Sequence, residues 1–127
     1  MAQNAEDKLV PRRPLLPCCL LLLLAEEPGH GYELADRLKQ FGFELSSPGP
    51  VYRELRVLEE SGFVRSAWSP ARSGPVPRVY EMTVNGRRAL DRCAEELLDV
   101  EQLLEDFRDR HRKLAPVSDG GRRRRRD

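Results

Sequence analysis

The stretch SSPGPVYRELRVLEESG, which runs from Ser46 to Gly62, carries the side chains best suited to chemistry with an anionic partner. Tyr52, Arg53 and Arg56 follow its Ser-Pro-Gly-Pro start. Arginine can bind guanine through two parallel hydrogen bonds, and tyrosine can hydrogen-bond a phosphate. The pattern therefore indicates DNA binding. A simpler alternative stays open, in which the two arginines only balance neighbouring glutamates on a solvated helix.

Patterns for catalysis or metal binding are not recognisable in the sequence. No nucleophile has a base at a familiar spacing, no glycine-rich loop joins a Lys and a Ser or Thr, and no carboxylates pair in an apolar setting. His30 and His111 stand far apart and belong to no Cys/His cluster. We therefore expect no enzyme activity, no cofactor and no metal site.

The three cysteines, Cys18, Cys19 and Cys93, cannot form a complete set of intramolecular disulfides, and the adjacent pair is poorly placed to bridge itself. This composition favours a reducing compartment, so a cytoplasmic protein is expected. Cys93 and His111 could sense redox state or pH, but both also fit as interior positions of a helical seam. A bridge between two copies of Cys93 would need two chains that cross closely there.

The apolar run from Leu15 to Ala25 follows Arg12 and Arg13, an order that mimics a secretory signal. The run is shorter than the ~20 residues that span a bilayer. Charged residues stand where a cleavage site would need small ones. A buried helix is the favoured interpretation, and we expect no membrane contact.

Apolar spacing predicts two helices before the opening stretch, preceded by a flexible polar arm over residues 1–13. The first helix should cover 15–27 and end at EPGHG, where proline and glycines break it. The second should cover GYELADRLKQFG and end at Gly42. Its apolar stripe consists of Tyr32, Ala35, Leu38 and Phe41.

The opening stretch itself predicts a third helix. Val51, Leu55 and Leu58 share the side that should face the core, whereas Arg53 and Arg56 lie on the other side. Ser47 is the expected N-cap. The prolines that follow it would then occupy first-turn positions whose N–H groups have no intrahelical partner, so they start the helix and do not interrupt it.

Two β-rich runs, FVRSAWS and RVYEMTV, predict a hairpin with PARSGPVP at its tip. Arg65, Arg72 and Arg78 give this wing its charge. Trp68 and Tyr80 are candidates to stack on a flat effector, but aromatic residues of a small hairpin also commonly close its core. Both alternatives remain open.

The clearest signal is a helix from Gly86 to about Leu114, for which Thr83 is the expected N-cap. Apolar residues alternate at spacings of three and four, as in a coiled-coil seam. A helix of about 29 residues is longer than a small domain can cover, so its far half should meet a second chain. The expected dimerisation residues are Leu90, Cys93, Leu97, Val100, Leu104, Phe107 and Leu114, with His111 also in the seam.

The net charge of +1 hides an uneven distribution. Residues 63–83 hold three arginines and one glutamate, and residues 116–127 hold five arginines and two aspartates. An anionic partner should meet the chain at these segments. The arginine tail could add affinity for DNA or could simply be solvated, and it has no apolar periodicity.

These elements predict a mainly α fold with a two-stranded β wing (α+β): a winged helix-turn-helix over 14–84, a dimerisation helix over 85–115 and a disordered tail over 116–127. In that architecture the third helix enters the DNA major groove and the wing reaches the backbone or minor groove. The candidate DNA-binding residues are Ser47, Gly49, Tyr52, Arg53, Arg56, Arg72 and Arg78.

The segments GHGYELADRL, SSPGPVYRELRVLEESGFVRSAW and GPVPRVYEMTVNGRRAL resemble, in order and spacing, the signatures of the PadR family of bacterial transcriptional regulators. The resemblance covers about residues 15 to 112. It implies a dimeric winged-helix repressor that binds double-stranded operator DNA and releases it when a small-molecule effector binds. By position, Tyr52, Arg53 and Arg56 would be recognition-helix residues, and the helix from Gly86 would form the dimer.

Two departures from the family pattern fall in the opening stretch. Many members have GTLY where this chain has GPVY, so Pro50 removes a hydroxyl and an N–H, and Arg53 stands where proline is common. The form VYRELRVLE with Trp68 is similar to the branch that includes polyhydroxybutyrate-responsive repressors. A rival hypothesis is a protein-interaction module that uses the helical seam and makes no direct DNA contact.

Overall fold

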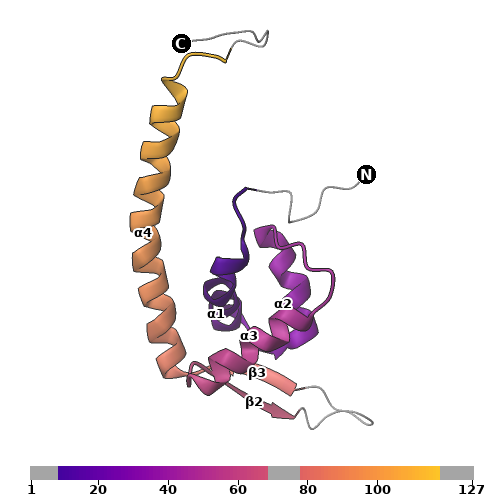
Figure 1. The fold of residues 1–127 in the computed structure, drawn as a ribbon. Coiled ribbons are helices and arrows are strands. Elements are labelled where there is room, and N and C mark those ends of the chain that lie inside the picture. The colour runs from indigo at the N-terminus through magenta and orange to yellow at the C-terminus, as the bar shows by residue number, and fades with distance from the viewer. Residues whose placement is uncertain (1–8, 69–77, 118–127) are drawn as a thin grey trace. The chain divides into compact units, whose positions relative to one another are not determined.

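The structure is a computed structural model that describes residues 9–68 and 78–117. Three helices pack beside a small sheet, and a long helix follows the sheet in the chain (Figure 1). This architecture confirms the predicted mainly helical winged-helix class. Its helices and strands are α1 (Leu16–Glu26), β1 (Gly29–His30), α2 (Gly31–Arg37), α3 (Gly49–Glu60), β2 (Val64–Trp68), β3 (Arg78–Met82) and α4 (Val84–Arg112).

The sheet has one strand more than the sequence predicts. The strand order is β1-β3-β2, and both pairings are antiparallel. β1 places Gly29 opposite Tyr80 and His30 opposite Val79. Two residues are too few to show the alternating pattern of a strand, and Pro28 followed by Gly29 is typical of a helix end. This short strand attaches the connection between α1 and α2 directly to the wing.

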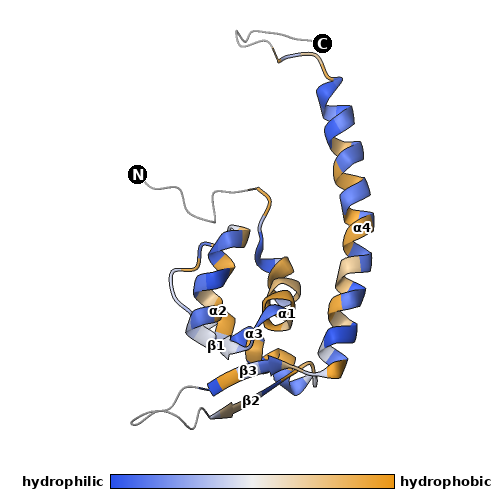
Figure 2. Cartoon of the chain, turned by 180° about the vertical axis from the view of Figure 1, so that it is seen from behind, coloured by the Kyte–Doolittle hydropathy of each residue, from blue (hydrophilic) through white to orange (hydrophobic). Residues whose placement is uncertain are grey.

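Leucines of α1 form the centre of the core. The helix is coloured as hydrophobic along most of its length (Figure 2), which reflects contact with α2, α3 and β3 on several sides. Burying one leucine side chain contributes about 1.5–3 kcal/mol. The interpretation of the apolar run as a buried helix is confirmed. The buried core residues of α1, α2, α3 and the 3-10 turn after α2 are Leu16, Leu20, Leu21, Leu23, Leu24, Leu34, Leu38, Val51, Leu55 and Leu58.

The second helix differs from its prediction in two ways. α2 ends at Arg37, and a 3-10 turn from Leu38 to Phe41 completes the segment. The predicted stop at Gly42 is confirmed, because this glycine has a left-handed φ of 83°. The prediction for Tyr32 is wrong: its side chain is 49% exposed and stacks on the His30 ring at 5.4 Å, outside the core.

The carbonyl end of α1 is capped by a residue of α2. Arg37 Nη2 donates a hydrogen bond to the Leu23 carbonyl at 3.0 Å, and Nη1 donates to the Glu27 carbonyl at 3.4 Å. A positive charge at this end also interacts favourably with the helix dipole. Arg37 therefore links the C-terminal end of α2 to the C-terminal end of α1.

The start of α3 is displaced by one residue from the expectation. Pro48 is the N-cap, with φ −78° and ψ 0°, and no side chain among the described residues caps the helix. The Pro48 carbonyl accepts the first helical hydrogen bond from Tyr52 N at 3.1 Å. The predicted cap by Ser47 is therefore wrong, because Ser47 lies one residue before the cap position. Pro50 does occupy the first turn, as predicted.

α4 runs from Val84 to Arg112, so it begins two residues before the predicted start at Gly86 and ends two residues before Leu114. The Thr83 hydroxyl accepts a hydrogen bond from Gly86 N at 3.0 Å and donates one to the Gly62 carbonyl at 2.6 Å. Thr83 is therefore confirmed as the N-cap. The described chain divides into two compact units, of which the first ends at Cys93 and the second begins at Ala94.

Gly86 provides the test of how α4 joins the winged helix. A Cβ built on Gly86 would lie 2.0 Å from the Phe63 carbonyl oxygen, which is backbone and cannot swing away. We expect Gly86→Ala to lower the free energy of unfolding by about 2 kcal/mol or more through overpacking. At an open helical position the same change would stabilise by about 0.5–1 kcal/mol. Thermal unfolding decides the sign, and a raised midpoint would contradict the close approach.

Candidate nucleic-acid interface

The outward face of α3 carries three of the predicted site residues. Tyr52, Arg53 and Arg56 are all exposed, whereas Val51 and Leu55 on the opposite side are fully buried. The helix thus separates a core face from a polar face, as its sequence period predicts. The exposed face is available to a partner along the whole length of the helix.

The Tyr52 ring is positioned by a glycine of α2. A Cβ on Gly31 would lie 2.3 Å from a ring carbon of Tyr52, so the ring rests directly on the α2 backbone. Tyr52 nevertheless keeps 40% of its surface exposed. This contact ties the first turn of α3 to the start of α2. The exposed part of the ring remains on the surface next to Arg53 and Arg56 in the same helix.

The arginines of α3 do not form ion pairs within the part of the chain that the structure describes. Glu59 instead accepts a hydrogen bond from the Ser66 hydroxyl at 2.8 Å. The alternative that Arg53 and Arg56 only balance neighbouring glutamates therefore finds no support in the ion pairs. Both guanidinium groups remain open to an external anion.

The start of α3 offers backbone donors beside these side chains. Within the described residues, the N–H groups of Gly49 and Val51 have no backbone acceptor, while Pro50 has no N–H to offer. The nearest groups to an added Cβ on Gly49 are Arg53 Nη1 at 3.5 Å and Ser47 Oγ at 3.6 Å. Backbone donors, a hydroxyl and a guanidinium thus gather at one helix start, where an anion is electrostatically favoured.

A hydrogen-bond chain connects the wing to α3. Arg78 Nη1 donates to Ser66 Oγ at 2.6 Å, and that hydroxyl donates to Glu59. The Arg78 guanidinium also lies 4.8 Å from the centre of the Trp68 ring, in a cation–π contact. Arg78 is therefore exposed but held on the wing surface. Arg72 and the wing connection lie outside the described residues.

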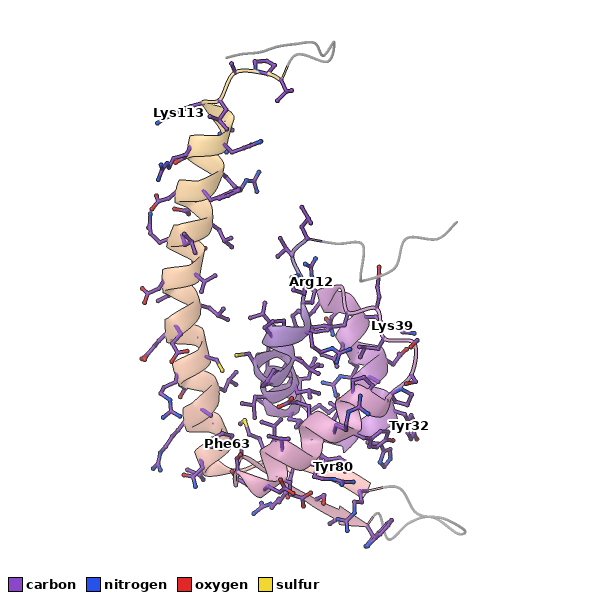
Figure 3. The ribbon with its side chains drawn as sticks, viewed as in Figure 1. Arg12, Tyr32, Lys39, Phe63, Tyr80 and Lys113 are labelled. Atoms are coloured by element: carbon purple, nitrogen blue, oxygen red, sulfur yellow. The ribbon has the colours of Figure 1, made fainter. Side chains whose placement is uncertain are left out.

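The two aromatic candidates for effector contact occupy different environments. Tyr80 is 8% exposed and belongs to the core cluster, whereas Trp68 is 61% exposed. Burial raises the pKa of Tyr80, and the charge of Glu59 raises it further, so the phenol stays neutral at physiological pH. Figure 3 labels Tyr80 at the sheet beneath α3. This position favours the alternative in which Tyr80 closes the core.

The predicted seam of α4 divides between two environments. Leu90 packs against the core of the first unit, and Cys93 Sγ contacts Cys18 Sγ of the same chain at 2.6 Å. Farther along, the apolar side chains are 37–70% exposed. We call this group the exposed seam: Leu97, Val100, Leu104, Phe107 and Leu114. In the same part of the helix, the rings of Phe107 and His111 stack at 6.4 Å.

Sequence reasoning missed the role of His30. Its backbone N–H donates to Glu33 Oε1 at 2.8 Å, so the Glu33 side chain caps the start of α2 at His30. Its ring Nδ1 lies 3.2 Å from the Arg78 carbonyl, which can only accept a hydrogen bond, so Nδ1 donates. The spacing of three residues to Glu33 was the signal that could have indicated the helix start.

Within the described ranges, no helix is long and apolar enough to cross a membrane. The expected flexible arm and the expected disordered tail fall mostly on residues 1–8 and 118–127, which lie outside the described residues. Both remain predictions.

Comparison with known proteins places these features in a family. The model of the transcriptional regulator PadR-like family matches residues 20–92. The probable transcriptional regulator Rv1176c of Mycobacterium tuberculosis is 35% identical over 85 residues, which cover 65% of this chain and 45% of that protein. The match therefore spans less than half the length of this curated relative.

Solved structures share the fold over most of the chain. A conserved protein of unknown function, TM0937, described as a potential transcriptional factor, is 36% identical with a TM-score of 0.70, covering 84% of this chain and 96% of that chain. The PadR-like transcriptional regulator BC4206 from Bacillus cereus is 23% identical with a TM-score of 0.67, covering 76% and 93% respectively, which shows the fold alone. Since the family model matches more than half of the chain, the protein belongs to the PadR-like family of transcriptional regulators.

Proposed function

We propose that this protein is a sequence-specific DNA-binding transcriptional regulator, without enzyme activity, that binds an inverted-repeat operator as a homodimer. The observation that carries this proposal is the outward face of α3, where Arg53 and Arg56 are exposed and lack ion-pair partners within the described residues. Such a face, on the third helix of a winged helix, matches the geometry of major-groove recognition.

In the proposed complex, α3 lies in the major groove and its arginines read base edges. Bidentate bonds from arginine to guanine are the commonest specific contact of this kind. The start of α3, with Gly49 N–H and the Ser47 hydroxyl, would bind a backbone phosphate, and Tyr52 would contact the same strand. Wing residues Arg72 and Arg78 would add contacts to the backbone or minor groove.

Dimerisation would use the exposed seam of α4. Four large apolar side chains exposed along α4, with Leu114 just beyond its end, are costly in water, and a second copy of the same segment would cover them with matching spacing. In such a dimer we expect the two α3 helices to meet the duplex about one DNA turn apart, ~34 Å. Leu90 and Cys93 also pack within their own chain, so the exposed seam carries the dimer proposal.

We further propose that the regulator is a cytoplasmic repressor that an effector releases from DNA. The family resemblance supports this mode of action. Trp68 is exposed on the wing, so its ring could stack on a flat effector. Tyr80 is buried in the core and would not contact that effector directly.

The second candidate function is a protein-interaction module, which the same exposed seam favours. The two functions differ in their response to salt. DNA affinity falls steeply as salt rises, because counterions are released from phosphates on binding, whereas an apolar helix contact is much less sensitive. A steep salt dependence of complex formation with DNA supports the regulator.

The α3 arginines provide the first test. Arg53→Ala and Arg56→Ala should each weaken binding to a duplex selected by the wild-type protein by about tenfold or more, since a bidentate base contact contributes about 1–3 kcal/mol. Fluorescence anisotropy measures the affinity. Arg87→Ala is the control, because Arg87 is exposed but paired with Asp91 on α4 at 3.1 Å. Wild-type affinity in both α3 variants would refute the assignment of this face.

The exposed seam provides the second test. Leu97→Asp combined with Leu104→Asp should convert the dimer to monomers, because each change buries a carboxylate in an apolar contact. Light scattering measures the molecular mass. Gln102→Asp adds an acid on the side of α4 away from the seam and should leave the dimer intact. A dimer that survives the double substitution would exclude the seam from the interface.

A further inference from the structure

Two cysteines that are 75 positions apart in the chain meet between α1 and α4. The Sγ atoms of Cys18 and Cys93 are 2.6 Å apart. Both side chains are half-buried, so they are reachable by a small solute. The structure records both residues as thiols. The sequence alone gave no reason to pair them.

A sulfur–sulfur bond requires about 2.05 Å between the two atoms, so the observed pair needs a shift of about half an ångström. We propose that Cys18 and Cys93 are a reversible modification site, at which a peroxide forms an intramolecular disulfide that joins α1 to α4. This proposal rests on the packing of the first unit and is independent of DNA binding. Disulfides in reducing compartments are usually transient and often serve redox sensing.

The chemistry balances with hydrogen peroxide as the oxidant. One cysteine, as its thiolate, attacks a peroxide oxygen and becomes a sulfenic acid, and the hydroxide that leaves takes up the thiol proton to form water. The second cysteine sulfur then attacks the sulfenic sulfur, forms the S–S bond and expels a second water. The two thiols lose two protons and two electrons, which reduce one peroxide to two waters. A dithiol reverses the bond by exchange.

The third cysteine is a poor competitor for this bond. Burial raises the pKa of Cys19, and the nearby Cys93 raises it further. Its thiol therefore stays protonated at neutral pH and reacts slowly, since the thiolate is the nucleophile. Cys19 is also adjacent to Cys18 in the chain, a spacing at which a disulfide is strained.

The bond would close a loop that contains α2, α3 and the whole sheet. Cys93 is the last residue of the first unit, so the disulfide would form at the C-terminal boundary of that unit. Closing a loop of 75 residues restricts the unfolded chain and should raise the thermal midpoint. We expect a rise of about 10–20 °C for a domain of this size.

The test uses the full chain with Cys19→Ser, so that only the proposed pair remains. Treatment with hydrogen peroxide should lower the intact mass by about 2 Da, yield a peptide that links Cys18 to Cys93, and raise the thermal midpoint. A dithiol should restore the original mass and midpoint. Cys18→Ser and Cys93→Ser, each in the Cys19→Ser background, are matched controls and should show neither change.

Three results would overturn the proposal. The mass could rise through sulfinic acid formation without any linked peptide. The linked peptide could join two copies of Cys93 from different chains. The wild-type protein could instead link Cys19 to Cys93. Peptide mapping under non-reducing conditions distinguishes all three from the expected Cys18–Cys93 bond.

Discussion

The burial of the α1 leucines is the constraint on which the rest of the molecule depends. Leu20, Leu21 and Leu23 have almost no exposed surface, and they contact elements that follow much later in the chain. Deleting such a side chain typically costs about 2–5 kcal/mol, a large part of the stability of a small domain. Because α1 fills the centre, α2, α3 and β3 must pack around it with their apolar sides inward.

That packing determines which residues can meet a partner. Val51, Leu55 and Leu58 of α3 are buried in the core. The opposite side of the helix therefore faces outward and carries Tyr52 and Arg53. The Tyr52 ring packs directly on Gly31. Hydrogen bonds from Arg78 to Ser66 and from Ser66 to Glu59 hold the wing beside the same helix. Core packing and the proposed DNA surface are therefore two sides of one helix, positioned by the same contacts.

Local periodicity was sufficient to predict much of this arrangement. The core face of α3, the cap at Thr83 and the two longer strands follow from spacing and side-chain chemistry within a few residues. The failures share a different cause. β1 is too short to carry a pattern, Ser47 misses the cap because Pro48 already accepts the first helical bond, and Tyr32 stacks on His30 outside the core. β1 depends on pairing with the distant strand β3, whereas the cap and the Tyr32 ring depend on local backbone and ring geometry that residue spacing does not report.

The candidate site could be predicted only where local spacing determines it. The arginines of α3 follow from one helix period, but their lack of ion pairs within the described chain is seen only in the structure. The contact between Cys18 and Cys93 spans 75 positions, and no local signal reports it. The family resemblance supplied the order of the elements, and the contacts between them required the structure.

The central claim is that two copies of α3 read DNA on one face of the duplex. Hydroxyl-radical footprinting of the purified protein, on a duplex that it selects from a random pool, tests this most directly. The account predicts two protected patches on the same face, with centres about one helical turn, ~34 Å, apart. Selection that enriches no sequence, or protection confined to a single patch, would contradict it.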